Sequence, residues 1–152
     1  MKTPALTLWQ PWASLVFLGL KKYETRGWGT PYRGQMWIHA ARRKVDWRAV
    51  QALQALDIPI PESFDFPLGC LVGIVNLTAV QLMVTDEQYE KARPVYRGGI
   101  ARISSQPAKE IATGIWEPGR YAWKLEDCQQ MEHPIYTRGY QGLWYPDSSV
   151  VS

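Results

Sequence analysis

Residues 6–40 have the sequence LTLWQPWASLVFLGLKKYETRGWGTPYRGQMWIHA, which joins one apolar segment to two segments of alternating polarity. Pro11 has the backbone angle favoured in the first turn of a helix, and apolar residues follow it at helical spacing. Gly19 suits the left-handed position that ends a helix. We therefore predict a strand over residues 5–9 and a short apolar helix from Pro11 to Gly19.

The charged part of this stretch, residues 22–28, has the two-residue period of a strand. Glu24 and Arg26 then share one face, whereas Thr25 points to the other. Residues 36–40 alternate in the same way and contain His39, one of only two histidines in the chain. We predict a second and a third strand here, joined by a turn that begins at Gly29.

The next segment begins with Asp46, which can cap a helix whose apolar stripe reaches residue 56. Residues 57–67 contain three prolines and are typical of a loop. Residues 69–80 are strongly apolar and rich in β-branched side chains, which favours a central strand. Gly73 inside this strand indicates a bulge or a close approach of another segment.

Further on, Thr85 and Gln88 have the spacing of a capping box, which predicts a short helix to about Arg93. The other expected elements are a long loop over residues 94–118 with one strand near Ile111, a strand over residues 121–125, and a strand or hairpin over residues 134–144.

The fold class follows from this order of elements. A chain of 152 residues is long enough to bury one substantial core, and it contains neither an internal repeat nor a linker between two cores. Several short strands without regular βαβ alternation predict an α+β protein. We expect a single domain over residues 1–152, with a small β-barrel flanked by two or three short helices.

The charge of the chain is mildly basic and uneven. The net charge is +3, and residues 1–76 hold nine Lys or Arg against five acidic residues, whereas residues 77–152 hold eight against nine. Arg42, Arg43 and Lys44 form a basic cluster in the first part. Such an excess can attract nucleic-acid phosphate, although a solvated surface gives the same composition.

The sequence shows no pattern typical of a cofactor site or of a membrane span. Cys70 and Cys128 lie far apart without a C-x-x-C spacing, so we expect free thiols, no metal site and no cofactor. The chain lacks an apolar run of about 18 residues and starts without the pattern of a secretory leader. We therefore expect a soluble cytoplasmic protein without an obligate protein partner.

Four short motifs follow one another in the opening stretch. They are Gln10-Pro11-Trp12, the string G-x-K-x-x-E-x-R formed by Gly19, Lys21, Glu24 and Arg26, then Tyr32-Arg33-Gly34 and Ile38-His39-Ala40. Together they resemble the ASCH domain family, and residues 10–28 are especially similar to its EOLA-type branch. The resemblance implies a PUA-like β-barrel with a cleft between the first helix and the charged strand. It also implies recognition of RNA or of a modified nucleoside.

The same resemblance raises an enzymatic alternative. Some family members are amidohydrolases of acetylated cytidine, and nuclease activity is also claimed for the family. In the amidohydrolase branch a lysine activates a threonine, and Glu24 occupies the matching threonine position here. A carboxylate cannot replace a hydroxyl nucleophile without a change of mechanism. The strand over residues 69–80 also contains Asn76 rather than the glutamate of that branch, so we rank binding above catalysis.

The candidate site residues fall into three chemical groups, and each has a structural alternative. Lys21 and Glu24 can contact a ligand, serve an amidohydrolase or ribonuclease, or form a partly exposed salt bridge. Arg26 can contact phosphate or pair with a neighbour, and His39 can contact a ligand, act as a general base or be a packed structural histidine. The remaining candidates are Arg33 for ligand contact, Trp12 and Trp28 for base stacking, and Arg42, Arg43 and Lys44 for phosphate. A third reading is a protein-interaction adaptor with a vestigial cleft.

Overall fold

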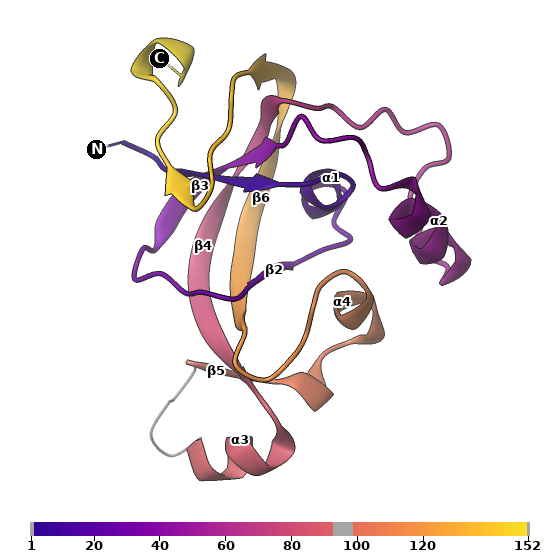
Figure 1. The fold of residues 1–152 in the computed structure, drawn as a ribbon, viewed down its shortest axis with the longest axis vertical. Coiled ribbons are helices and arrows are strands. Elements are labelled where there is room, and N and C mark those ends of the chain that lie inside the picture. The colour runs from indigo at the N-terminus through magenta and orange to yellow at the C-terminus, as the bar shows by residue number, and fades with distance from the viewer. Residues whose placement is uncertain (1, 93–98, 152) are drawn as a thin grey trace.

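Seven strands form one sheet in the computed structural model, which describes residues 2–92 and 99–151 (Figure 1). The strands are β1 (Ala5–Leu8), β2 (Tyr23–Arg26), β3 (Gly34–Ala40), β4 (Cys70–Val84), β5 (Ile100–Arg102), β6 (Tyr121–Tyr136) and β7 (Leu143–Trp144). The helices are α1 (Trp12–Phe17), α2 (Trp47–Ala55), α3 (Asp86–Ala92), α4 (Ala108–Ala112) and α5 (Ser148–Val151), with a 3-10 turn at Ile103–Ser105.

The long antiparallel pair of β4 and β6 is the centre of the sheet (Figure 1). The strand order is β2-β6-β4-β3-β1-β7, and β5 pairs in parallel with the end of β4. β1 runs parallel to β3, and α1 packs against β1, β3, β4 and β6. The main core lies between α1 and the sheet, around the fully buried Trp123.

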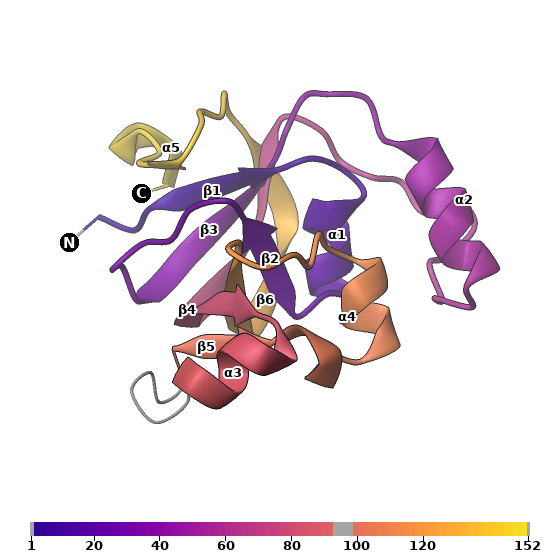
Figure 2. The ribbon, with the colours of Figure 1, turned by 60° about the horizontal axis from the view of Figure 1, so that its bottom comes forward.

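The α+β class is confirmed, but the expected closed barrel is wrong for the described residues. The two end strands, β2 and β7, do not pair with each other in the described sheet. β7 covers only Ala5 and Leu6 of β1, because Gly142 in a left-handed conformation (φ 69°) precedes it and Pro146 follows it. The rest of β1 therefore lies beside β2 without a strand between them (Figure 2).

The contact between α1 and β4 explains Gly73. A Cβ atom at this position would lie 2.4 Å from the Phe17 ring and 2.6 Å from the Gln129 carbonyl oxygen. The β4–β6 register also shifts next to Gly73. Both the predicted bulge and the predicted close approach are therefore confirmed. Glycine is needed here because it lets α1 lie directly on the sheet.

Local signals at the helix ends are also confirmed. The Asp46 side chain accepts a hydrogen bond of 3.0 Å from the Ala49 amide at the start of α2. Thr85 and Gln88 make the reciprocal bonds of a capping box at 3.0 and 3.2 Å. Gly19 has φ 75° just after α1. The described part of α3 ends at Ala92, and Arg93 lies outside the described residues.

The expectation for residues 94–118 is wrong over its described part. Residues 94–98 lie outside the described residues, and the following residues form β5, the 3-10 turn and α4. Ile111 belongs to α4 rather than to a strand, because Pro107 caps a run of good helix formers. The described chain thus has more helices than the two or three predicted.

The predicted strand or hairpin at residues 134–144 is divided between two parts of the sheet. Its first residues continue β6 to Tyr136, whereas β7 pairs with β1 rather than folding back on β6.

None of the helices within residues 2–92 and 99–151 has the length and apolar character needed to cross a membrane.

Candidate ligand-binding cleft

An open cleft of about 1010 Å³ lies along the neighbouring edges of β1 and β2. β1 contributes Thr7 and Leu8, and β2 contributes Glu24, Thr25 and Arg26. The other walls come from α1, from residues 113–115 after α4, and from residues 138–142 before β7. The opening in the sheet thus becomes a site of the size that takes a small molecule.

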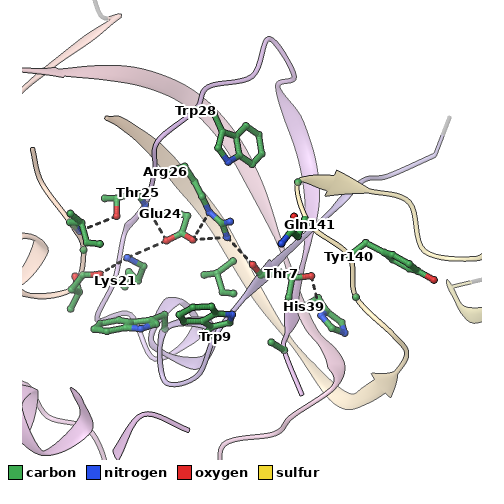
Figure 3. A pocket seen from close by; sticks show the side chains of 18 of the residues that line it. Thr7, Trp9, Lys21, Glu24, Thr25, Arg26, Trp28, His39, Tyr140 and Gln141 are labelled. Carbon is green, nitrogen blue, oxygen red and sulfur yellow. Dashed lines mark hydrogen bonds and ion pairs between the residues drawn. The ribbon is translucent and has the colours of Figure 1, made fainter. Parts of the chain in front are cut away.

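Glu24 is the centre of a buried charge cluster at the cleft (Figure 3). Its Oε2 atom accepts a 3.0 Å hydrogen bond from Arg26 Nε, and its Oε1 atom accepts one of 3.0 Å from the Thr25 amide. Lys21 Nζ lies 3.5 Å from Glu24 Oε1. Lys21 is 2% exposed and Glu24 8% exposed, so the pair is buried rather than partly exposed as the structural alternative supposed.

Lys21 reaches Glu24 because it lies at the bend before β2 rather than on the strand. Its ammonium group also donates a hydrogen bond to the Thr113 carbonyl after α4. Burial lowers the pKa of Lys21, and the negative charges of Glu24 and Glu110 act in the opposite direction. The lysine is therefore held by one ion pair and one carbonyl in a largely desolvated position.

Glu110 supports this cluster from α4, and the sequence analysis did not identify it. Its Oε1 atom accepts a 2.9 Å hydrogen bond from the Lys22 amide. Its Oε2 atom is buried and has no hydrogen-bond partner among the described residues. The carboxyl thus joins α4 to the chain that enters β2 and acts electrostatically on Lys21.

Arg26 spans the opening between the two strand edges. Its Nη2 atom donates a 2.7 Å hydrogen bond to the Thr7 carbonyl of β1, while its Nε atom contacts Glu24. The Arg26 side chain thus takes the place of the backbone bonds that would close a barrel. The side chain remains partly exposed in the cleft, so its planar guanidinium can also meet a ligand.

Three exposed aromatic rings form the rim. Trp9 is 55% exposed, Trp28 37% and Tyr140 54%. Trp28 and Trp9 lie on two sides of the Glu24–Arg26 pair in Figure 3, and Tyr140 lies farther away, beyond Gln141. The Trp28 ring packs edge-on against the buried Trp123, with ring centres 4.9 Å apart. The predicted Trp12 also lines the cleft and lies 5.8 Å below Lys21 Nζ, measured to the ring centre.

His39 lines the cleft with both ring nitrogens occupied. Nε2 lies 2.7 Å from the Thr137 carbonyl, so it carries the proton and donates. Nδ1 lies 3.2 Å from the Thr7 hydroxyl, which accepts a 2.9 Å bond from Trp144 and donates to the histidine. Burial lowers the pKa of His39. This geometry favours the packed structural histidine over a general base.

The loop over residues 138–142 rests directly on this histidine. A Cβ atom at Gly139 would lie 2.5 Å from the His39 ring and 2.7 Å from the Thr7 hydroxyl. Only glycine allows so close an approach. The buried pair therefore fixes the position of the loop that brings Tyr140 and Gln141 to the lining of the cleft.

The lining of the cleft is strongly cationic. Among the described residues it contains five basic side chains and one acidic side chain, Glu24. The basic ones are Lys21, Arg26, Arg42, Arg120 and Arg138. A concave surface of this composition attracts anionic ligands.

The other predicted basic residues lie apart from the lining. Arg43 is exposed and stacks on the Trp9 ring at 3.7 Å, and Lys44 is exposed. Arg33 donates to the carbonyls of Thr30 and Tyr32 in the turn before β3, and it does not line the cleft. The sequence prediction counted Arg33 among the ligand contacts, but Arg33 does not line the cleft; it assigned Arg42 only to phosphate, and Arg42 does line the cleft.

Sequence reasoning missed several cleft residues that lie outside the opening motif string. They are Thr7, Trp9, Arg120, Arg138, Tyr140 and Gln141. One signal was available, because Gly139 and Gly142 bracket an aromatic residue near the end of the chain. Two glycines at this spacing indicate a loop in close contact with another segment.

The fold and the site together describe an α+β domain whose sheet opens into a cationic cleft with exposed aromatic rings at its rim. The ASCH domain profile matches residues 6–141, so the chain belongs to the ASCH domain family, as its motifs predicted. It is 43% identical over 152 residues to Activating signal cointegrator 1 of Homo sapiens. This match covers 95% of this chain and 22% of the human protein. The Mus musculus protein of the same name is 42% identical over 129 residues, and this match covers 80% of this chain and 22% of the mouse protein.

The chain therefore spans about 22% of the length of the curated relatives it matches. Among solved structures, the crystal structure of ASCH from Zymomonas mobilis is similar with a TM-score of 0.54 and 16% identity. The match covers 99% of this chain and 91% of that one. A similarity at 16% identity shows only that the two proteins share a fold.

Proposed function

We propose that this domain binds RNA or a modified nucleoside in the cleft between α1, β1 and β2. The observation that carries the proposal is the combination of five basic side chains with three exposed aromatic rings around one opening. Basic side chains attract phosphate, and an exposed ring can stack on an unpaired base. Family membership supports the same class of ligand.

The two kinds of side chain have different tasks in this proposal. Trp28 and Trp9 offer stacking surfaces on opposite sides of the Glu24–Arg26 pair in Figure 3. Arg26 lies between them with a planar fork that suits a base edge or a phosphate. A base held in this way is read by stacking and by polar contacts at its edge, as in other single-strand recognition sites.

Trp28→Ala and Trp9→Ala are expected to weaken binding of a short single-stranded RNA by ~1–3 kcal/mol each, because each removes one stacking surface. Fluorescence anisotropy with labelled RNA measures the loss. Trp47→Ala is the matched control, because Trp47 is similarly exposed but lies on α2 outside the cleft. It should leave the affinity unchanged.

Salt dependence tests the electrostatic part of the same proposal. The logarithm of the affinity should fall with the logarithm of the salt concentration with a slope of about −0.7 per phosphate contact. An affinity that changes neither with salt nor with Trp28→Ala would contradict the proposal.

A second candidate function is hydrolysis of a modified nucleoside or of RNA through Lys21 and Glu24. The observation that favours it is the lowered pKa of Lys21 at an open cleft, since a buried lysine with a lowered pKa can accept a proton. Both oxygens of Glu24 are already engaged by neighbouring groups, which favours binding over chemistry.

Incubation with N4-acetylcytidine and with short RNA, followed by chromatography, distinguishes the two functions. Under the binding proposal, neither substrate is converted. Turnover that disappears in Lys21→Met but persists in Lys22→Ala would establish the enzyme instead. Lys22 is the matched control because its side chain is exposed and lies outside the cleft. Circular dichroism of Lys21→Met checks that the lost turnover does not reflect unfolding.

A further inference from the structure

A second cleft of about 670 Å³ adjoins the first. Arg42 and Arg138 line both clefts, so these two side chains stand on the boundary between them. The other lining residues of the second cleft are Leu68, Gly69, Tyr136 and Thr137. Two arginines that line both openings offer donors for an anion that continues from one opening into the other.

Arg42 is held in place on this boundary by Gly69. A Cβ atom at Gly69 would lie 2.6 Å from Arg42 Cγ, and Gly69 has φ 68°. Backbone hydrogen bonds fix the glycine, which donates to Ala40 at 2.8 Å and accepts from Thr137 at 3.1 Å. The stem of Arg42 therefore lies directly over the backbone, which limits the freedom that the side chain would lose on binding.

Each of the two clefts that share this arginine pair also has an exposed tyrosine. The Arg138 guanidinium is 5.2 Å from the centre of the Tyr140 ring, which lines the first cleft. Tyr136 is 72% exposed and lines the second cleft at the end of β6. The first cleft thus has Tyr140, the second has Tyr136, and both share the two arginines.

We propose that the ligand is a single-stranded oligonucleotide of at least two nucleotides rather than a free nucleoside. This inference rests on the proposed function. One base enters the first cleft, Arg42 and Arg138 hold the phosphodiester that follows, and the next nucleotide lies in the second cleft against Tyr136. A free nucleoside lacks the phosphate and would leave both arginines unused.

Competition against labelled single-stranded RNA tests this arrangement. The competitors are the nucleoside that binds the wild-type protein best, the dinucleoside monophosphate made from it, and the same dinucleotide with an uncharged methylphosphonate linkage. The charged dinucleotide should compete roughly tenfold better than the nucleoside, because charge-assisted bonds to the phosphate are added. The uncharged analogue should lose most of this gain.

Variants assign the gain to particular side chains. Arg42→Ala and Arg138→Ala should weaken the charged dinucleotide and change the uncharged analogue much less. Tyr136→Ala should weaken both dinucleotides and leave the nucleoside unchanged. Arg48→Ala is the matched control, since Arg48 is exposed on α2 and lines neither cleft. It should change none of the three competitors.

The outcomes separate this inference from the proposed function. If the nucleoside competes as well as the dinucleotide, or if Arg42→Ala weakens the charged and uncharged linkages equally, the second site is wrong while binding in the first cleft stands. If the wild-type protein does not bind the labelled RNA and no competitor binds, the proposed function and this inference both fail.

Discussion

Glu24→Ala is expected to lower the free energy of unfolding by about 3–5 kcal/mol, because it leaves a buried ammonium group without its counter-charge. Lys21 is 2% exposed, and its Nζ atom lies 3.5 Å from Glu24 Oε1. Arg26 loses its ion pair with Glu24 in the same change. Chemical denaturation monitored by tryptophan fluorescence measures the loss. Glu87→Ala is the matched control, because it breaks an ion pair with Lys91 that is exposed on both sides and should cost less than about 0.5 kcal/mol.

The deficit of Glu24→Ala should shrink as the pH rises. Burial lowers the pKa of Lys21 in the folded protein, and Glu24 opposes this shift, so removing Glu24 lowers the pKa further. Between the folded pKa and the unfolded value of 10.5, the unfolded chain binds more protons than the folded one. Stability therefore rises with pH over this window, which is wider in the variant. A deficit that stays constant up to pH 10 would contradict the role of Lys21.

Trp123→Ala is expected to cost about 3–5 kcal/mol, because truncating a fully buried tryptophan leaves a large cavity. For a chain of this length, each kcal/mol lowers Tm by roughly 2–4 °C. The variant should also weaken ligand binding, since Trp123 packs against the Trp28 ring and donates a 3.2 Å bond to the Trp28 carbonyl.

Trp123→Phe separates the two effects. It keeps an aromatic ring in the core but lacks the indole N–H, so it should lose less stability and retain part of the support of Trp28. Calorimetry and RNA binding, measured on the same samples, check both expectations. If Trp123→Ala were no less stable than Trp47→Ala, the packing of the core around Trp123 would be contradicted.

The parts of the fold that depend on neighbouring residues could be predicted from the sequence. Gly19, Asp46 and the Thr85–Gln88 box act on amides within a few residues, and each has the predicted effect. The closure of the sheet could not be predicted in this way. It depends on how far β7 pairs along β1, and the alternating pattern of a strand does not specify its partner.

The same difference between local and distant contacts decides which parts of the site could be predicted from the sequence. Lys21, Glu24 and Arg26 lie on one continuous segment, so their motif placed them together correctly. The groups that complete the cluster come from distant parts of the chain. Lys21 donates to Thr113, 92 residues away, and His39 donates to Thr137, 98 residues away. No local pattern in the sequence encodes such contacts.

The bridge from Arg26 to Thr7 constrains how this cleft can acquire new specificities. Arg26 faces the ligand space and also joins the two edges of an incomplete sheet, so a substitution that changes recognition there also loosens the fold. Trp9, Tyr140 and Arg42 line the cleft and are exposed, and they can vary at a smaller cost in stability. Divergence of ligand preference among related domains should therefore begin at the rim and reach the charged centre last.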